Sequence, residues 1–277
     1  MRVPDNEGIA VKRVRFVAAL GVLVGVASLA QAEERDFCAD RPGKATPSCT
    51  LDTGHVQIEA GLFDYAYSRD SDTAESDYSS GNLLLVYGVN DSLEARVGWD
   101  GYGWTRSRDR MTGLVEHGQG AGDLTLSVRQ NLRHPDDTGT AFAIQPSITL
   151  PIGRDPIGAG TWSAGVLMPF GADLAKNWRL TLDPEVDAAP DQDRHGRHLA
   201  YAMAAAVTRS IGDAWQLSGE GWVMRDDDPS GHETQASVDF SAAWQPDKNR
   251  QVDLSAYVGA NHATPRIEMV FGVAQRF

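Results

Sequence analysis

The stretch LLLVYGVNDSLEARVGW, residues 83–99, decides the fold of this chain. In its second half, apolar side chains occupy every other position of residues 93–99 and alternate with Glu94 and Arg96. The polar residues 90–92 separate that half from the apolar run before it. Alternation with a period of two on both sides of a short turn predicts two antiparallel strands with one apolar and one polar face.

The same alternation recurs along the rest of the chain in segments of about ten residues. A spanning strand needs only about 9 to 11 residues, half of them polar, so a mean hydropathy of −0.33 is compatible with membrane insertion. The sequence therefore predicts an all-β protein, a transmembrane antiparallel up-and-down β-barrel of about twelve strands over residues 54–277. The predicted strands begin near Val56, Leu83, Leu93, Leu124, Phe142, Trp162, Trp178, Leu199, Trp215, Ala236, Val252 and Ile267.

The connections between these segments alternate in length. Short ones are expected at residues 90–92, 133–139, 176–177, 212–213 and 246–250, and longer ones at 68–80, 100–121, 153–160, 187–197 and 226–232. Short periplasmic turns and long outer loops are typical of bacterial outer-membrane barrels. A soluble β-sandwich also has alternating strands, but it has no reason to confine long loops to every second connection.

The N-terminal residues 1–32 are typical of a secretory signal peptide. Lys12, Arg13 and Arg15 precede an apolar run over residues 16–30, and small residues follow at 30–32. The run is roughly 15 residues long, whereas a membrane-spanning helix needs about 20, so cleavage is favoured over a helical anchor.

Residues 33–53 are expected to form a periplasmic N-terminal segment. The chain has only two cysteines, Cys38 and Cys49, and both lie in this segment of an exported protein. A disulfide between them is expected, because the periplasm is oxidising and no third cysteine competes. The sequence leaves open whether the segment also folds into the barrel as a plug.

The charge balance excludes one class of partner. Asp and Glu outnumber Lys and Arg by 38 to 25, which gives a formal net charge of −13. Such a chain repels phosphate and offers no basic patch, so nucleic acid is not an expected partner. Nothing in the sequence calls for a cofactor.

The polar faces of the predicted strands point into the lumen and determine what passes. Acidic residues outnumber basic ones on these faces, which favours cations, while the aromatic residues offer surfaces for a planar solute. A closed, salt-bridged interior is the alternative. The lumen-lining candidates are Glu59, Phe63, Tyr65, Glu94, Arg96, Asp123, Arg129, Arg179, Asp183, Glu220, Trp222, Asp239, Asp253, Tyr257, Arg266 and Glu268.

A search for catalytic or metal-binding patterns gives little. No serine lies in a G-x-S-x-G elbow, and the seven histidines lack the spacing of a zinc hydrolase helix, so no enzymatic activity is expected. Two acidic loops can bind a divalent cation: one contains Asp191, Asp193, His195 and His198, and the other is 226–228. Solvated acidic loops are the simpler interpretation of both.

Several motifs together resemble a family of outer-membrane barrels labelled MetA-pathway of phenol degradation, whose members are also described as transporters. They are FCADRPGKATPSCTLDTGHVQIE, the hairpin at 83–99, GAGDLTLSVRQNL, AFAIQPSITLPIG, LMPF and LTLDPEVD. The resemblance implies a location in the bacterial outer membrane, contact with its lipid, and uptake of small, possibly aromatic, solutes.

The C-terminal GVAQRF resembles the signal that the barrel assembly machinery reads, with Gly272 and the final Phe277. It departs from the usual pattern at Gln275, where an aromatic residue is common. We therefore expect a narrow passive channel for small solutes. A non-conducting structural or adhesive barrel is the second hypothesis, and an outer-membrane enzyme the third.

Overall fold

A computed structural model describes residues 34–277, and within them the regular structure consists of β-strands. The predicted signal peptide lies outside the described residues. No helix in residues 34–277 is long and apolar enough to cross a membrane. The strands are β1 (Val56–Arg69), β2 (Thr73–Ser80), β3 (Asn82–Asn90), β4 (Leu93–Trp99), β5 (Tyr102–Asp109), β6 (Val115–Ala121), β7 (Leu124–Arg133), β8 (Thr140–Leu150), β9 (Ser163–Leu167), β10 (Phe170–Ala175), β11 (Trp178–Pro190), β12 (Arg197–Ile211), β13 (Trp215–Asp226), β14 (Glu233–Asp247), β15 (Arg250–Gly259) and β16 (Ile267–Arg276).

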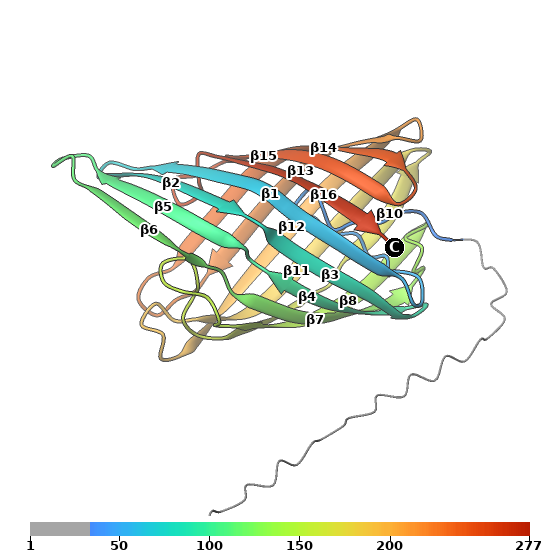
Figure 1. The fold of residues 1–277 in the computed structure, drawn as a ribbon, viewed down its shortest axis with the longest axis horizontal. Coiled ribbons are helices and arrows are strands. Elements are labelled where there is room, and N and C mark those ends of the chain that lie inside the picture. Colours follow the sequence, from blue (N-terminus) through green and yellow to red (C-terminus); the bar gives the residue numbers. More distant parts are fainter. Residues whose placement is uncertain (1–33) are drawn as a thin grey trace, which may run out of the picture. The chain divides into compact units, whose positions relative to one another are not determined.

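The strands of residues 35–277 form one closed antiparallel barrel (Figure 1). Around the ring the strands follow the order β3, β4, β7, β8 and then β11 to β16, and β1 closes the ring by pairing with both β3 and β16. The short strands β9 and β10 share the position between β8 and β11. Twelve positions result, which confirms the predicted fold class and strand number.

Two of the predicted long loops are wrong. Most of residues 68–80 and 100–121 form strands instead, because β2 pairs with the outer half of β1 and β5 and β6 add to the edge of β2 (Figure 1). Gly81 and Gly101 adopt positive φ angles of 77° and 74° where each strand breaks, a conformation that glycine tolerates best. These three strands lack an apolar residue at every second position. The pattern that predicts the barrel strands therefore does not predict them.

The outward face of the barrel is apolar. Leu85, Leu126, Met203 and Phe240 are 45%, 39%, 39% and 61% exposed, far more than soluble proteins allow for a continuous band of such residues. At the end where the short turns and the C-terminus lie, the Trp215 and Trp244 rings stack with centroids 6.3 Å apart. An apolar band with aromatic residues at its rim is suited to a lipid bilayer.

A β-bulge at Leu62 reverses the facing of the outer half of β1. Gly61 pairs with Gly272, but the next pair is Phe63 with Phe271, so one residue is skipped and the alternation shifts. Phe63 and Tyr65 therefore share the outward face of their partners on β16, and the Tyr65 and Tyr78 rings lie tilted against each other with centroids 4.7 Å apart. Their expected place in the lumen is wrong, because a bulge leaves no mark in the apolar pattern.

Candidate functional site: a plugged lumen

Residues 35–53, here called the plug, lie against the inner wall of the barrel. The predicted periplasmic segment is thus an interior element from residue 35 onward, which resolves the question that the sequence left open. The expected disulfide between Cys38 and Cys49 is confirmed, with their Cα atoms 6.6 Å apart. The plug has no regular secondary structure, so its position depends on contacts with the strands.

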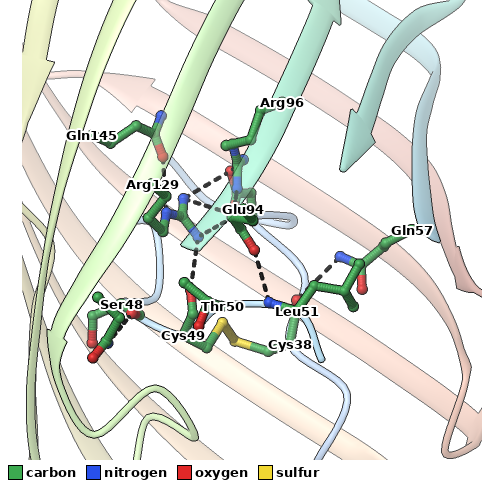
Figure 2. Close-up of polar contacts among 12 residues, drawn as sticks. Cys38, Ser48, Cys49, Thr50, Leu51, Gln57, Glu94, Arg96, Arg129 and Gln145 are labelled. Carbon is green, nitrogen blue, oxygen red and sulfur yellow. Dashed lines mark hydrogen bonds and ion pairs between the residues drawn. A yellow bond between two sulfur atoms is a disulfide. The ribbon is translucent and has the colours of Figure 1, made fainter. Parts of the chain in front are cut away.

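The deepest contact joins Asp40 of the plug to two arginines of the wall (Figure 2 shows the arginines). Arg129 donates to Asp40 over 3.0 Å and to the Cys49 carbonyl over 3.3 Å, and Arg96 donates to both Asp40 and Glu94. Arg129, Arg96 and Glu94 are 1%, 4% and 2% exposed. Because these charges are withdrawn from water, their mutual pairing is required to hold them in their ionised forms.

Arg41 of the plug pairs with Asp253 on β15, with its Nη2 atom 3.1 Å from Oδ1 and its Nε atom 3.2 Å from the same oxygen. Its guanidinium lies over Gly272 on β16, where a Cβ atom would overlap it. Gly272, a candidate element of the assembly signal, therefore also makes room for the plug.

Lys44 of the plug sits in an aromatic and acidic cage. Its ammonium group lies 4.3 Å from the Tyr257 ring centroid, 4.6 Å from that of Trp222, and 3.6 Å from Asp239. Cation–π attraction is stronger where water is excluded, and Asp239 is only 2% exposed. Trp222 and Tyr257 thus face the lumen, where they contact a lysine of the chain itself.

Several wall carboxylates accept hydrogen bonds from the backbone of the plug. Glu59 accepts from the amides of Asp40 and Arg41, and Glu220 accepts from those of Lys44 and Ala45. Asp183 and Glu94 accept similarly from Thr46 and Leu51. These bonds satisfy carboxylate oxygens of the wall with backbone N–H groups, so the acidic excess of the wall is matched to a polar segment.

The plug divides the lumen into two cavities. One, of 530 Å³, lies on the side of the short turns and is lined by plug residues and by the hydroxyl groups of Thr181, Thr208, Ser210, Ser218 and Ser241. The other, of 260 Å³, lies on the outer side and is lined by Asn82, Trp99, Thr125 and Tyr257 among others. Residues 40–43 line both cavities, so this short stretch is the partition between them.

The remaining candidates lie away from the plug centre. Asp123 accepts from the amides of Gly153 and Ala159 and so fixes an outer loop. Arg179 pairs with Asp137 and Asp173 at the mouth formed by the short turns. Glu268 faces inward, opposite Tyr257. Arg266 is exposed at the outer rim, where it donates to the Arg69 carbonyl, so its expected place in the lumen is wrong.

Sequence reasoning missed the plug residues Asp40, Arg41 and Lys44, which complete the charge pattern of the lumen. The stretch ADRPGKA offered a signal, since it carries these three charges directly after Cys38. Their partners are up to 212 residues away, and nothing in one sequence shows which charges meet.

Comparison with known proteins places the chain among outer-membrane barrels. A family model described as "Putative MetA-pathway of phenol degradation" matches residues 39–277. The chain belongs to this family. The match to the phenol-degradation family covers both the barrel and most of the plug, and it confirms the resemblance that the motifs indicated. No curated protein matches the chain.

Solved structures with the same fold are bacterial. An outer membrane channel from Pseudomonas putida F1 has a TM-score of 0.67 at 15% identity, covering 86% of this chain and 99% of that one. The beta domain of the Bordetella autotransporter Brka has a TM-score of 0.51 at 13% identity, with coverages of 82% and 100%. The transport unit of the autotransporter AIDA-I from Escherichia coli has a TM-score of 0.51 at 8% identity, with coverages of 80% and 90%. The fold of this phenol-degradation family member is therefore that of bacterial outer-membrane barrels.

Proposed function

We propose that this protein is a narrow passive channel of the bacterial outer membrane for small solutes, with the plug as its constriction. The observation that carries the proposal is a pair of cavities on the two sides of the plug, both of which are lined by residues 40–43. A barrel with a purely structural role has no need of internal cavities of this size. Transport rather than catalysis is the role that this geometry supports.

The lining supports small neutral or cationic solutes. On the outer side of the plug, the inner wall carries half-buried carboxylates. Among the described residues, Asp64, Glu185 and Glu268 have no ion-pair partner. On the side of the short turns, the wall presents hydroxyl and amide groups, which can hydrogen-bond equally well to water or to a phenolic hydroxyl. The family description agrees with solute uptake, as does the likeness to an outer membrane channel of Pseudomonas putida F1, and an aromatic solute is part of the proposal.

The outer-membrane environment supplies the other partners. The exposed apolar band is suited to contact with membrane lipid. We further propose that the barrel assembly machinery inserts the chain, with Gly272 and Phe277 in its signal. In the structure the Phe277 amide donates to the Val56 carbonyl over 2.8 Å, so the C-terminal residue takes part in closing the barrel.

A structural or adhesive barrel is the second candidate, and the density of plug contacts favours it. A plug that never moves leaves both cavities closed to each other, and the chain then only anchors its outer extension. The two hypotheses differ in one measurable property, the passage of ions.

Planar bilayer recording on refolded protein tests the channel. We expect small single-channel steps in the wild type and larger or longer steps in the double variant Arg41→Ala, Lys44→Ala, because both cations that hold residues 40–46 are removed. Arg209→Ala is the matched control, since Arg209 is exposed and lies over the Trp178 ring, outside the lumen. Absence of conductance in both wild type and double variant would establish the structural barrel instead.

A further inference from the structure

Two connections at the outer end of the barrel lie against each other. Residues 191–196 join β11 to β12, and residues 227–232 join β13 to β14. The Gln192 amide donates to Asp228 over 2.7 Å, and the Ser230 hydroxyl donates to the Gln192 side chain over 2.7 Å. These contacts bring acidic residues from separate parts of the chain to the same place.

His198, at the outer end of β12, is at the centre of this contact. Its Nδ1 atom lies 2.9 Å from Asp191 Oδ1 and 3.5 Å from Asp228 Oδ2, and its Nε2 atom lies 2.8 Å from Asp226 Oδ1. Within residues 34–277, Nε2 is one of the buried polar atoms that make no well-directed hydrogen bond. One imidazole therefore faces three carboxylates.

The cluster is nearly buried and is short of positive charge. The side chain of His198 is 5% exposed, and those of Asp228 and Asp191 are 12% and 18% exposed. The neighbouring cations are engaged elsewhere: Arg225 pairs with Asp227 at 2.8 Å, and Arg194 pairs with Asp155 at 2.7 Å. Even a protonated His198 leaves two negative charges in excess, and clustered carboxylates at low exposure require a compensating cation.

We propose that His198, Asp191 and Asp228 bind a divalent transition-metal ion of the Zn²⁺ type. Nδ1 of His198 and one oxygen of each carboxylate lie within 4.8 Å of one another. Ligands about 2.1 Å from a tetrahedral zinc ion are about 3.4 Å apart, so small side-chain rotations suffice to complete the site. Water or a further carboxylate oxygen would supply the fourth ligand.

Asp226 has a different part in this site. A histidine that binds metal through one nitrogen usually donates its other N–H to a carboxylate, which fixes the tautomer and the ring orientation. Asp226 lies on the Nε2 side of His198, opposite the two ligand carboxylates, with its Oδ1 atom 2.8 Å from Nε2, so a small rotation of the ring would direct the N–H at it. It is a positioning residue rather than a ligand.

The donor set selects the class of metal. Calcium and magnesium take oxygen ligands, whereas an imidazole together with carboxylates suits zinc and neighbouring transition metals. Gly196 keeps the site open, because a Cβ atom there would overlap the Asp191 carboxylate. The ion would join two outer loops above the lumen, independently of whether the barrel conducts.

Metal binding to refolded protein without a histidine tag, freed of metal by a chelator, tests the site. We expect about one Zn²⁺ per chain in equilibrium dialysis, and a Co²⁺ absorption spectrum of a nitrogen- and oxygen-ligated ion. His198→Gln should weaken binding by well over tenfold and Asp226→Asn by about 10- to 100-fold. His195→Gln is the matched control, because His195 is in the same loop but its side chain is 89% exposed.

Three results would overturn the proposal: no stoichiometric Zn²⁺ in the wild type, equal loss in the His195 and His198 variants, or Ca²⁺ competing as well as Zn²⁺. Gel migration before and after boiling shows whether each variant is a folded barrel. A His198 variant that does not fold is replaced by Asp228→Asn, whose expected loss of Zn²⁺ is the same.

Discussion

Two parts of the inner wall differ in how they contact the plug. On β4 and β7, Glu94, Arg96 and Arg129 form what we call the charged wall, and each side chain bonds to the plug or to a neighbour that does. On β11 to β14, the residues Thr181, Thr208, Ser210, Ser218 and Ser241 form the hydroxyl wall, which borders a 530 Å³ cavity. Buried charges must be paired, whereas hydroxyl groups exchange water easily, so the charged wall holds the plug and the hydroxyl wall borders open space beside it.

The largest effect is expected from breaking the charged wall. Arg129→Met leaves Glu94 and Asp40 without one of their cations, and removing one partner of a buried ion pair costs about 3–5 kcal/mol. Unfolding in urea, followed by gel migration, should show this loss of stability. The control Arg209→Met, at an exposed site, should change it by less than about 1 kcal/mol. Equal stability of both variants would contradict the role given to the charged wall.

Removing the disulfide tests how far the internal structure of the plug contributes to its docking. The bridge closes a loop with a sequence separation of 11. Its removal gives the undocked plug more conformational freedom, which should destabilise the docked plug by about 3 kcal/mol. Because the barrel ladder remains, we expect Cys38→Ser, Cys49→Ser to keep its heat-modifiable migration but to open more often in bilayers. Reductant added to the wild type should reproduce the effect and should leave the double variant unchanged.

Measurements of ion selectivity should distinguish unpaired lumen carboxylates from those held in ion pairs. Glu185→Gln and Glu268→Gln should each reduce the cation preference seen as a reversal potential in a salt gradient, because these carboxylates have no ion-pair partner in the described chain. Glu94→Gln should change plug stability more than selectivity, since Glu94 is already paired with Arg96. Identical shifts from Glu94 and Glu268 would show that pairing does not distinguish them.

The smallest effect is expected on the hydroxyl wall. The hydroxyl groups of Thr208 and Ser218 lie 2.7 Å apart beside the cavity. Thr208→Val keeps the shape but removes a hydrogen-bonding group, so conductance should fall modestly while stability is nearly unchanged. Ser76→Ala, on the outer extension β2, is the control. A conductance unaltered by Thr208→Val would place the path elsewhere in the lumen.

The sequence predicted the strands of the barrel wall and the facing of most of their side chains, since a lipid-facing residue at every second position is imposed by the membrane itself. Glu94, Arg129 and Asp253 were assigned to the lumen on that basis, and the structure places all three in the interior. The position of the plug was not predictable, because residues 35–53 have neither an apolar period nor regular structure. Its position depends on charge partners distant in sequence, and no local pattern encodes which of them meet.

The place where Arg41 lies has a consequence for the order of folding. Its guanidinium lies over Gly272 of β16 and near Gly61 of β1, and these two glycines face each other across the pairing of the first and last strands. This position of the Arg41 guanidinium is complete only when β1 and β16 have paired. We therefore expect the plug to dock after the ring has closed, and to hold together a seam that stays open while the barrel is being inserted.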